Sequence, residues 1–171
     1  MCNIIVASGG KPKVFPGWNV DGVKIITSRE ALLQKEAPDS VAIIGAGPIG
    51  MEFATVWRRY GAEVTVIEAM TRVLPLEDEE ISKEAENQFA RAGISVRTGA
   101  KVENFTANDN GVELSLVTKQ GPETLRVSKL LIAVGTVPEI EDLGLDAMNV
   151  RLQRGFVAVD DTMATNIAGI Y

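Results

Sequence analysis

Residues 41–50 read VAIIGAGPIG, and this stretch decides the fold. Its first four residues are all apolar, which is typical of a strand buried on both faces of a parallel sheet. The glycines that follow have the spacing GxGxxG. Apolar residues then recur at helical spacing as far as Tyr60, and Gly61 ends the predicted helix. The stretch therefore predicts a buried strand, a tight glycine turn and a helix that begins at the turn.

A second apolar run, VTVI at residues 64–67, predicts the next strand, and Glu68 closes it. Strand, helix and strand form one βαβ unit, whose crossover is expected to be right-handed. Glu68 stands 23 residues after Gly45. This is close to the ~20 residues that separate the glycines from the ribose-binding acid in dinucleotide-binding proteins. A GxGxxG spacing in this context predicts a dinucleotide-binding site.

Each glycine of this loop has its own expected role. Gly45 permits the tight turn, Gly47 leaves room for the pyrophosphate, and Gly50 lets helix and strand pack closely. The helix N-terminus offers N–H groups and partial positive charge to the pyrophosphate, and Pro48 is tolerated there because its missing N–H would be unpaired anyway. The expected cofactor loop comprises Gly45, Ala46, Gly47, Pro48, Ile49 and Gly50. The alternative is that the glycines form a tight turn and nothing more.

Glu68 is expected to accept hydrogen bonds from the adenosine ribose hydroxyls. Its charge would repel a 2′-phosphate, so the sequence favours NAD over NADP. Arg72 lies four residues further on, where it would either meet such a phosphate or remain a solvated or helix-pairing cation. Glu52 has two interpretations. It is either a carboxylate that favours the first turn of a helix without any cofactor, or a residue with a role in the site.

The rest of the chain predicts further elements around this unit. An acidic start at Glu77 opens a helix that ends at Gly93, and residues 94–97 are typical of a third parallel strand. Residues 101–128 form short alternating segments divided by two strong turn sequences, which predicts an antiparallel meander. An apolar strand at residues 129–134 follows the meander.

Shorter elements are expected near both ends of the sequence. The predicted set comprises strands at 3–7, 23–26, 156–159 and 167–171, a loop at 11–22, and a helix capped by Ser28 and ending near Glu36. The predicted fold class is α/β. It is a Rossmann-like NAD-binding domain with a central parallel sheet, flanking helices and an antiparallel β-meander.

Composition excludes many kinds of active site. The 171 residues include no histidine and one cysteine, Cys2. This removes Ser-His-Asp and Cys-His catalysis, histidine zinc sites, histidine-ligated haem and intrachain disulfides, so we expect no catalytic residue and no metal site here. The net charge of −6 argues against nucleic acid, and the lack of a long apolar run argues against a membrane. With no targeting segment visible, a cytoplasmic location is expected.

Five segments carry a recognisable pattern: NIIVASG at 3–9, VAIIGAGPIGMEF at 41–53, VLP at 73–75 with the acidic residues after it, LLIAVG at 130–135, and GFVAVD at 155–160 with the residues up to Tyr171. In this order they resemble the FAD-dependent pyridine nucleotide–disulfide oxidoreductases. Within that family the dihydrolipoamide dehydrogenases are the most similar. Thr136 and Glu139 depart from the pattern, because many members carry Arg and Asn there.

The resemblance implies a division of the chain. Residues 1–36 would be a margin of the FAD domain and a linker, 37–137 the NAD-binding domain, and 138–171 a return segment into the FAD domain. The family's flavin fingerprint, its CxxxxC redox disulfide and its C-terminal His–Glu pair have no counterpart in this sequence. The chain is therefore expected to be an NAD-binding piece of a longer flavoprotein, inactive by itself, with FAD bound only by the full-length parent.

The resemblance also implies roles for five residues that spacing alone does not assign. Val102 matches an adenine-side contact, and Gly135 matches a loop near the nicotinamide half. Glu52 matches a residue near the flavin–nicotinamide junction, and this match supports the interpretation in which Glu52 has a role in the site. Ser8 and Gly9 match the margin that touches FAD.

By the same resemblance, the parent enzyme passes a hydride from dihydrolipoamide, through its disulfide and FAD, to NAD. Mercuric reductase, glutathione reductase-like enzymes and a flavoprotein transhydrogenase are alternatives within the family. A stand-alone NAD-binding sensor module is an alternative outside it. The implied partners are the remaining FAD and dimerisation domains of the parent chain, a second parent subunit in a homodimer, and a 2-oxo acid dehydrogenase complex.

Overall fold

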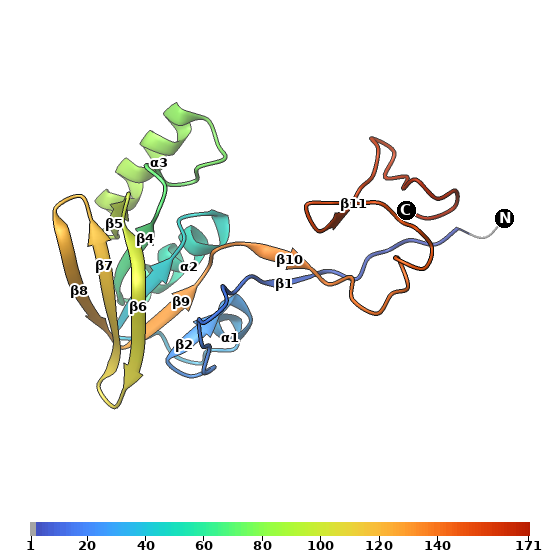
Figure 1. Ribbon diagram of the computed structural model, residues 1–171. Helices are drawn as coiled ribbons and strands as arrows, with labels where there is room; N and C mark the ends of the chain where they lie inside the picture. Colours follow the sequence, from blue (N-terminus) through green and yellow to red (C-terminus); the bar gives the residue numbers. More distant parts are fainter. Residues whose placement is uncertain (1–2) are drawn as a thin grey trace. The chain divides into compact units, whose positions relative to one another are not determined.

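The computed structural model describes residues 3–171, which form two compact units (Figure 1). The larger unit comprises residues 14–135. The smaller unit comprises the described residues up to Lys13 together with residues 136–171. The division into FAD-domain margins and an NAD-binding domain remains a prediction.

A five-stranded parallel sheet forms the centre of the larger unit, which confirms the predicted fold class. Its strands, in spatial order, are β2 (Ile25–Thr27), β9 (Lys129–Ile132), β3 (Ser40–Ile44), β4 (Glu63–Glu68) and β5 (Ser95–Thr98). The apolar run that begins at Val41 occupies the central strand, β3, and is buried from Val41 to Ile44. The uniform apolar pattern therefore arises because both faces of this strand are covered.

Helices cover one of these faces. They are α1 (Ser28–Leu32), α2 (Pro48–Arg59) and α3 (Glu79–Arg91). Met51, Ala54 and Trp57 of α2 pack in one buried cluster with Ile43 of β3 and Val66 of β4. The predicted helix is present, but its apolar residues do not all face the sheet. Met51, Ala54 and Trp57 form the buried face, whereas Val56 and Tyr60 are exposed.

The start of α1 differs by one residue from the sequence-based prediction. Thr27, not Ser28, is the N-cap, and its side chain forms a reciprocal capping box with Glu30. A capping box needs Ser or Thr three residues before Glu or Gln, a condition that Thr27 meets and Ser28 does not. The helix also ends at Leu32, earlier than the expected end near Glu36.

The predicted meander is present and covers the opposite face of the sheet. It comprises β6 (Lys101–Asn108), β7 (Gly111–Thr118) and β8 (Gly121–Val127), all antiparallel. Leu114 and Leu116 of β7 pack with Ala42 and Ile44 of β3. Because Ala42 and Ile44 alternate along β3 with Ile43, which faces the helices, the larger unit has three layers.

The smaller unit contains two short antiparallel pairs. β1 (Gly10–Pro12) pairs with β10 (Thr136–Pro138), and β11 (Leu152–Gln153) pairs with β12 (Phe156–Val157). The expected strands at 3–7 and 167–171 are reduced to one parallel bridge between Ile4 and Ile170. Conversely, β1 lies where a loop was expected. Such short segments owe their state to the strand beside them, which the sequence does not reveal.

Packing of the meander on the sheet predicts unequal effects for two substitutions in β7. Leu114 is 0% exposed, so Leu114→Ala should lower the free energy of unfolding by about 2–5 kcal/mol. Val117 lies on the other face of the same strand and is 40% exposed, so Val117→Ala should cost under about 1 kcal/mol. Urea denaturation of both variants measures the difference. Equal losses would contradict the layered packing.

Candidate nucleotide-binding site

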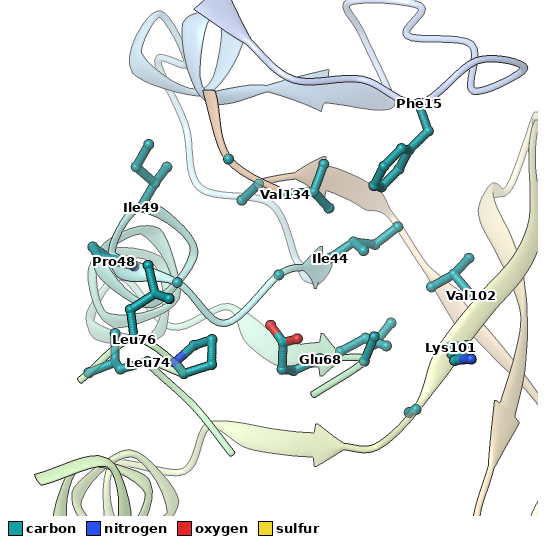
Figure 2. Close-up of a pocket in the computed structure, with 18 of the residues that line it drawn as sticks. Phe15, Ile44, Pro48, Ile49, Glu68, Leu74, Leu76, Lys101, Val102 and Val134 are labelled. Atoms are coloured by element: carbon teal, nitrogen blue, oxygen red, sulfur yellow. The ribbon is translucent and has the colours of Figure 1, made fainter. Parts of the chain in front are cut away.

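A pocket of about 530 Å³ lies at the carboxyl ends of β3, β4 and β9 (Figure 2). Parallel α/β sheets bind ligands at this edge of the sheet. Seven of the predicted site residues line the pocket: Gly45, Gly47, Pro48, Ile49, Glu68, Val102 and Gly135. The structure therefore brings most of the predicted cofactor residues together around one hollow.

Two of the three glycines are required by the chain's own backbone. Gly45 has a φ of +106°, and a Cβ atom there would lie 2.4 Å from the carbonyl oxygen of Ala133. A Cβ atom on Gly50 would lie 2.0 Å from the carbonyl oxygen of Gly45. These contacts match the expected roles in the tight turn and in close helix–strand packing.

Gly47 differs from the other two glycines. Its φ of −75° and ψ of 180° are open to any residue, and apart from its two chain neighbours no described residue has an atom within 4 Å of where its Cβ would be. Gly47 is also the N-cap of α2 and lines the pocket. Its missing side chain therefore leaves open space directly at a helix N-terminus, which is where a pyrophosphate would bind.

Glu68 has a structural role that the sequence did not predict. It is only 8% exposed, and its carboxylate accepts hydrogen bonds from the backbone N–H groups of Ala46, at 2.7 Å, and Met70, at 2.8 Å. The side chain thus ties the end of β4 to the glycine loop. Each carboxylate oxygen has a second lone pair, so both can still accept from a ligand. Figure 2 shows the carboxylate oxygens directed into the pocket.

The segment after β4 forms another wall of the pocket, and Arg72 supports it. The Arg72 guanidinium donates to the carbonyl oxygens of Pro75, at 3.1 Å, and Glu77, at 3.2 Å. Both of those residues line the pocket. Arg72 also lies 3.8 Å from the carboxylate of Glu79, at the start of α3. These partners favour the interpretation of Arg72 as a helix-pairing cation over that of a phosphate ligand.

The remaining predicted residues lie outside this pocket. Ala46 and Gly50 belong to the glycine loop but are buried and do not line the pocket. Glu52 is exposed on α2 and lies beyond the first turn, so the interpretation as a first-turn carboxylate is wrong. Ser8 and Gly9 belong to the smaller unit, where they line a second pocket of about 640 Å³.

Sequence reasoning missed several lining residues of the first pocket, including Phe15, Trp18, Lys101 and Val134. Phe15 and Trp18 come from the segment that was expected to be only a loop. Two large aromatic residues three positions apart in a Pro- and Gly-rich loop were an available signal, because exposed aromatic residues often mark binding surfaces. Lys101 and Val134 carry no comparable signal.

Two kinds of feature are missing from residues 3–171. This described part contains no group of three or more His, Cys, Asp or Glu residues placed to hold a metal ion. It also contains no helix with the length and apolar character needed to span a membrane.

Comparison with known proteins defines the class to which this fold and pocket belong. The family model described as pyridine nucleotide-disulphide oxidoreductase matches residues 1–171. The chain is 46% identical over 170 residues to dihydrolipoyl dehydrogenase of Chlorobaculum tepidum, and 42% identical over 171 residues to that of Mycobacterium leprae. Each alignment covers 99% of this chain and 36% of the relative. The chain therefore belongs to the pyridine nucleotide–disulphide oxidoreductase family.

Solved structures agree with this assignment. The chain matches LpdA from Mycobacterium tuberculosis with a TM-score of 0.86 and 31% identity, covering 99% of this chain and 36% of that one. It matches the flavoprotein disulfide reductase RclA from Escherichia coli with a TM-score of 0.82 and 26% identity, covering 99% and 38%. The chain thus spans little more than a third of the length of the proteins it resembles.

The geometry of the glycine loop predicts different effects of alanine at its three glycines. Gly47→Ala should change the free energy of unfolding by less than about 1 kcal/mol, because its backbone and surroundings accept a Cβ, while alanine is a poorer helix N-cap than glycine. Gly50→Ala should lower it by about 1–3 kcal/mol or more through overlap with Gly45. Gly45→Ala should also be destabilising, because its φ is strained for alanine. Chemical denaturation ranks the three variants, and a Gly47→Ala variant as destabilised as Gly50→Ala would contradict the geometry.

Proposed function

We propose that residues 14–135 bind NAD(H) in the 530 Å³ pocket. The observation that carries this proposal is Gly47, where neither backbone conformation nor packing within the described structure requires a glycine. A bound pyrophosphate at the N-terminus of α2 supplies the missing reason. The helix contributes N–H groups there, and Pro48 and Ile49 line the pocket beside them.

The other predicted contacts then follow along the pocket. Glu68 accepts from the hydroxyls of the adenosine ribose through the lone pairs that its backbone partners leave open. Val102 lies on the adenine side, and Gly135 lies near the nicotinamide half. Glu52 remains a proposed residue of the flavin–nicotinamide junction, and Ser8 and Gly9 remain proposed residues of the margin that touches FAD.

We further propose that the chain is a piece of a dihydrolipoyl dehydrogenase, which its relatives of that name support. When bound, NAD supplies the hydride acceptor. The residues of this chain bind and orient the cofactor, and none of them acts as acid, base or nucleophile. Substrate oxidation, FAD binding and dimerisation are assigned to the rest of the parent protein, so this chain alone neither retains FAD nor oxidises dihydrolipoamide.

The parent is proposed to be a cytoplasmic homodimer that serves a 2-oxo acid dehydrogenase complex. Mercuric reductase, glutathione reductase-like enzymes and a transhydrogenase remain alternative parents, because the substrate is selected by segments outside these residues. A stand-alone sensor would bind NAD through the same pocket. Sequencing the gene on both sides of this chain decides between a sensor and a flavoprotein.

Titration of the full 171-residue chain with NADH tests the proposed binding. Wild-type protein should bind NADH, and Gly47→Ala should weaken binding at least about tenfold, which corresponds to ~1.4 kcal/mol. Because this variant is expected to be about as stable as wild type, unfolding cannot explain the loss. Calorimetry supplies the dissociation constants. Wild-type protein that binds no NADH would overturn the proposed function.

Cofactor choice gives a second prediction. A charge-assisted hydrogen bond from a ribose hydroxyl to Glu68 nets ~1.5–3 kcal/mol. A 2′-phosphate about 4 Å away would instead cost roughly 4 kcal/mol at an effective dielectric near 20, before screening. Wild-type protein should therefore prefer NADH to NADPH at least about tenfold. Glu68→Ala should lower the ratio of the affinity for NADH to the affinity for NADPH.

The ratio is the informative quantity, because Glu68→Ala also releases the N–H groups of Ala46 and Met70 and so loosens the loop for both cofactors. Glu63→Ala, an exposed carboxylate at the opposite end of β4, is the matched control and should leave the ratio unchanged. Equal wild-type affinities for NADH and NADPH would show that Glu68 does not set the preference.

A further inference from the structure

Three aromatic rings form a continuous chain beside the pocket. Phe15 and Trp18 contact edge to face, with ring centroids 5.1 Å apart and an interplanar angle of 83°. Trp18 contacts Phe105 of β6 in the same way, at 5.2 Å and 79°. The backbone N–H of Trp18 also donates to the backbone carbonyl oxygen of Phe15, at 3.0 Å. The meander thus holds Phe15 in place through Trp18.

Phe15 is 41% exposed and lines the pocket. Figure 2 shows it at the end of the pocket where Val102, Ile44 and Val134 also lie. A large aromatic side chain that is held in place yet still open to the pocket is typical of a ligand contact. An ordinary core residue would instead be covered.

The order of groups along the pocket indicates which part of a ligand meets this ring. Figure 2 shows Glu68 between Pro48 on one side and Val102 on the other. A pyrophosphate at the N-terminus of α2 and a ribose at Glu68 leave the base on the far side of the ribose. That position is the end of the pocket next to Val102 and Phe15, where Lys101 also lines the wall.

We propose that Phe15 is a specificity-determining residue that packs against the adenine ring of the bound dinucleotide. This inference rests on the proposed NAD(H) binding. Flat bases stack favourably on aromatic side chains, and Ile44, Val102 and Val134 offer aliphatic contacts at the same end of the pocket. Phe15 thereby favours a ligand with a planar base at this end over one that ends at the ribose phosphate.

The test compares NADH with ADP-ribose, which keeps the adenine but lacks the nicotinamide. Both ligands are titrated into wild-type chain and into Phe15→Ala and Phe15→Tyr. Phe15→Ala should weaken both ligands about tenfold, which corresponds to ~1.4 kcal/mol. Phe15→Tyr keeps the ring and should restore both affinities to within about threefold of wild type.

Tyr60→Ala is the matched control, because Tyr60 is a 77% exposed aromatic residue at the C-terminus of α2, away from the pocket lining. It should leave both affinities unchanged. A loss with NADH but not with ADP-ribose would overturn the adenine assignment, and so would no loss with either. Wild-type protein that binds neither ligand would overturn the proposed function itself.

Discussion

The buried carboxylate of Glu68 is the interaction on which the site depends. A buried charge is costly unless it is hydrogen-bonded, and the N–H groups of Ala46 and Met70 satisfy it. Through these two bonds, one side chain at the end of β4 sets the position of the glycine loop after β3. The N–H of Leu74 donates to the carbonyl oxygen of Ala46, at 2.8 Å, and so joins the next wall to the same loop. Hydrogen bonds within the chain therefore hold the loop and two walls of the pocket together.

Sequence patterns predicted the central architecture because each pattern has a direct physical cause. The run from Val41 to Ile44 is uniformly apolar because helices and meander cover both faces of β3. The alternation in residues 101–128 arises because only one face of the meander is covered. The glycine spacing predicted the tight turn between β3 and α2, because Gly45 and Gly50 are required there by close contacts with the backbone of Ala133 and of Gly45, respectively.

Other features depend on neighbours that are distant in the sequence. Glu68 was expected to serve only the ligand, because spacing does not show which backbone N–H groups a side chain meets in the fold. Phe15 was missed because the course of its loop is set by contacts with the meander. The short strands β1 and β10 exist only because they pair with each other across more than a hundred residues.

A crystal structure of this chain grown with NAD⁺ tests the central claim most directly. The account predicts the pyrophosphate over Gly47, the adenosine ribose within hydrogen-bond distance of Glu68, and the Glu68 carboxylate still bound to the N–H groups of Ala46 and Met70. The claim would be contradicted by NAD⁺ bound elsewhere on the chain. It would also be contradicted by a Glu68 side chain that must leave the glycine loop to admit the cofactor.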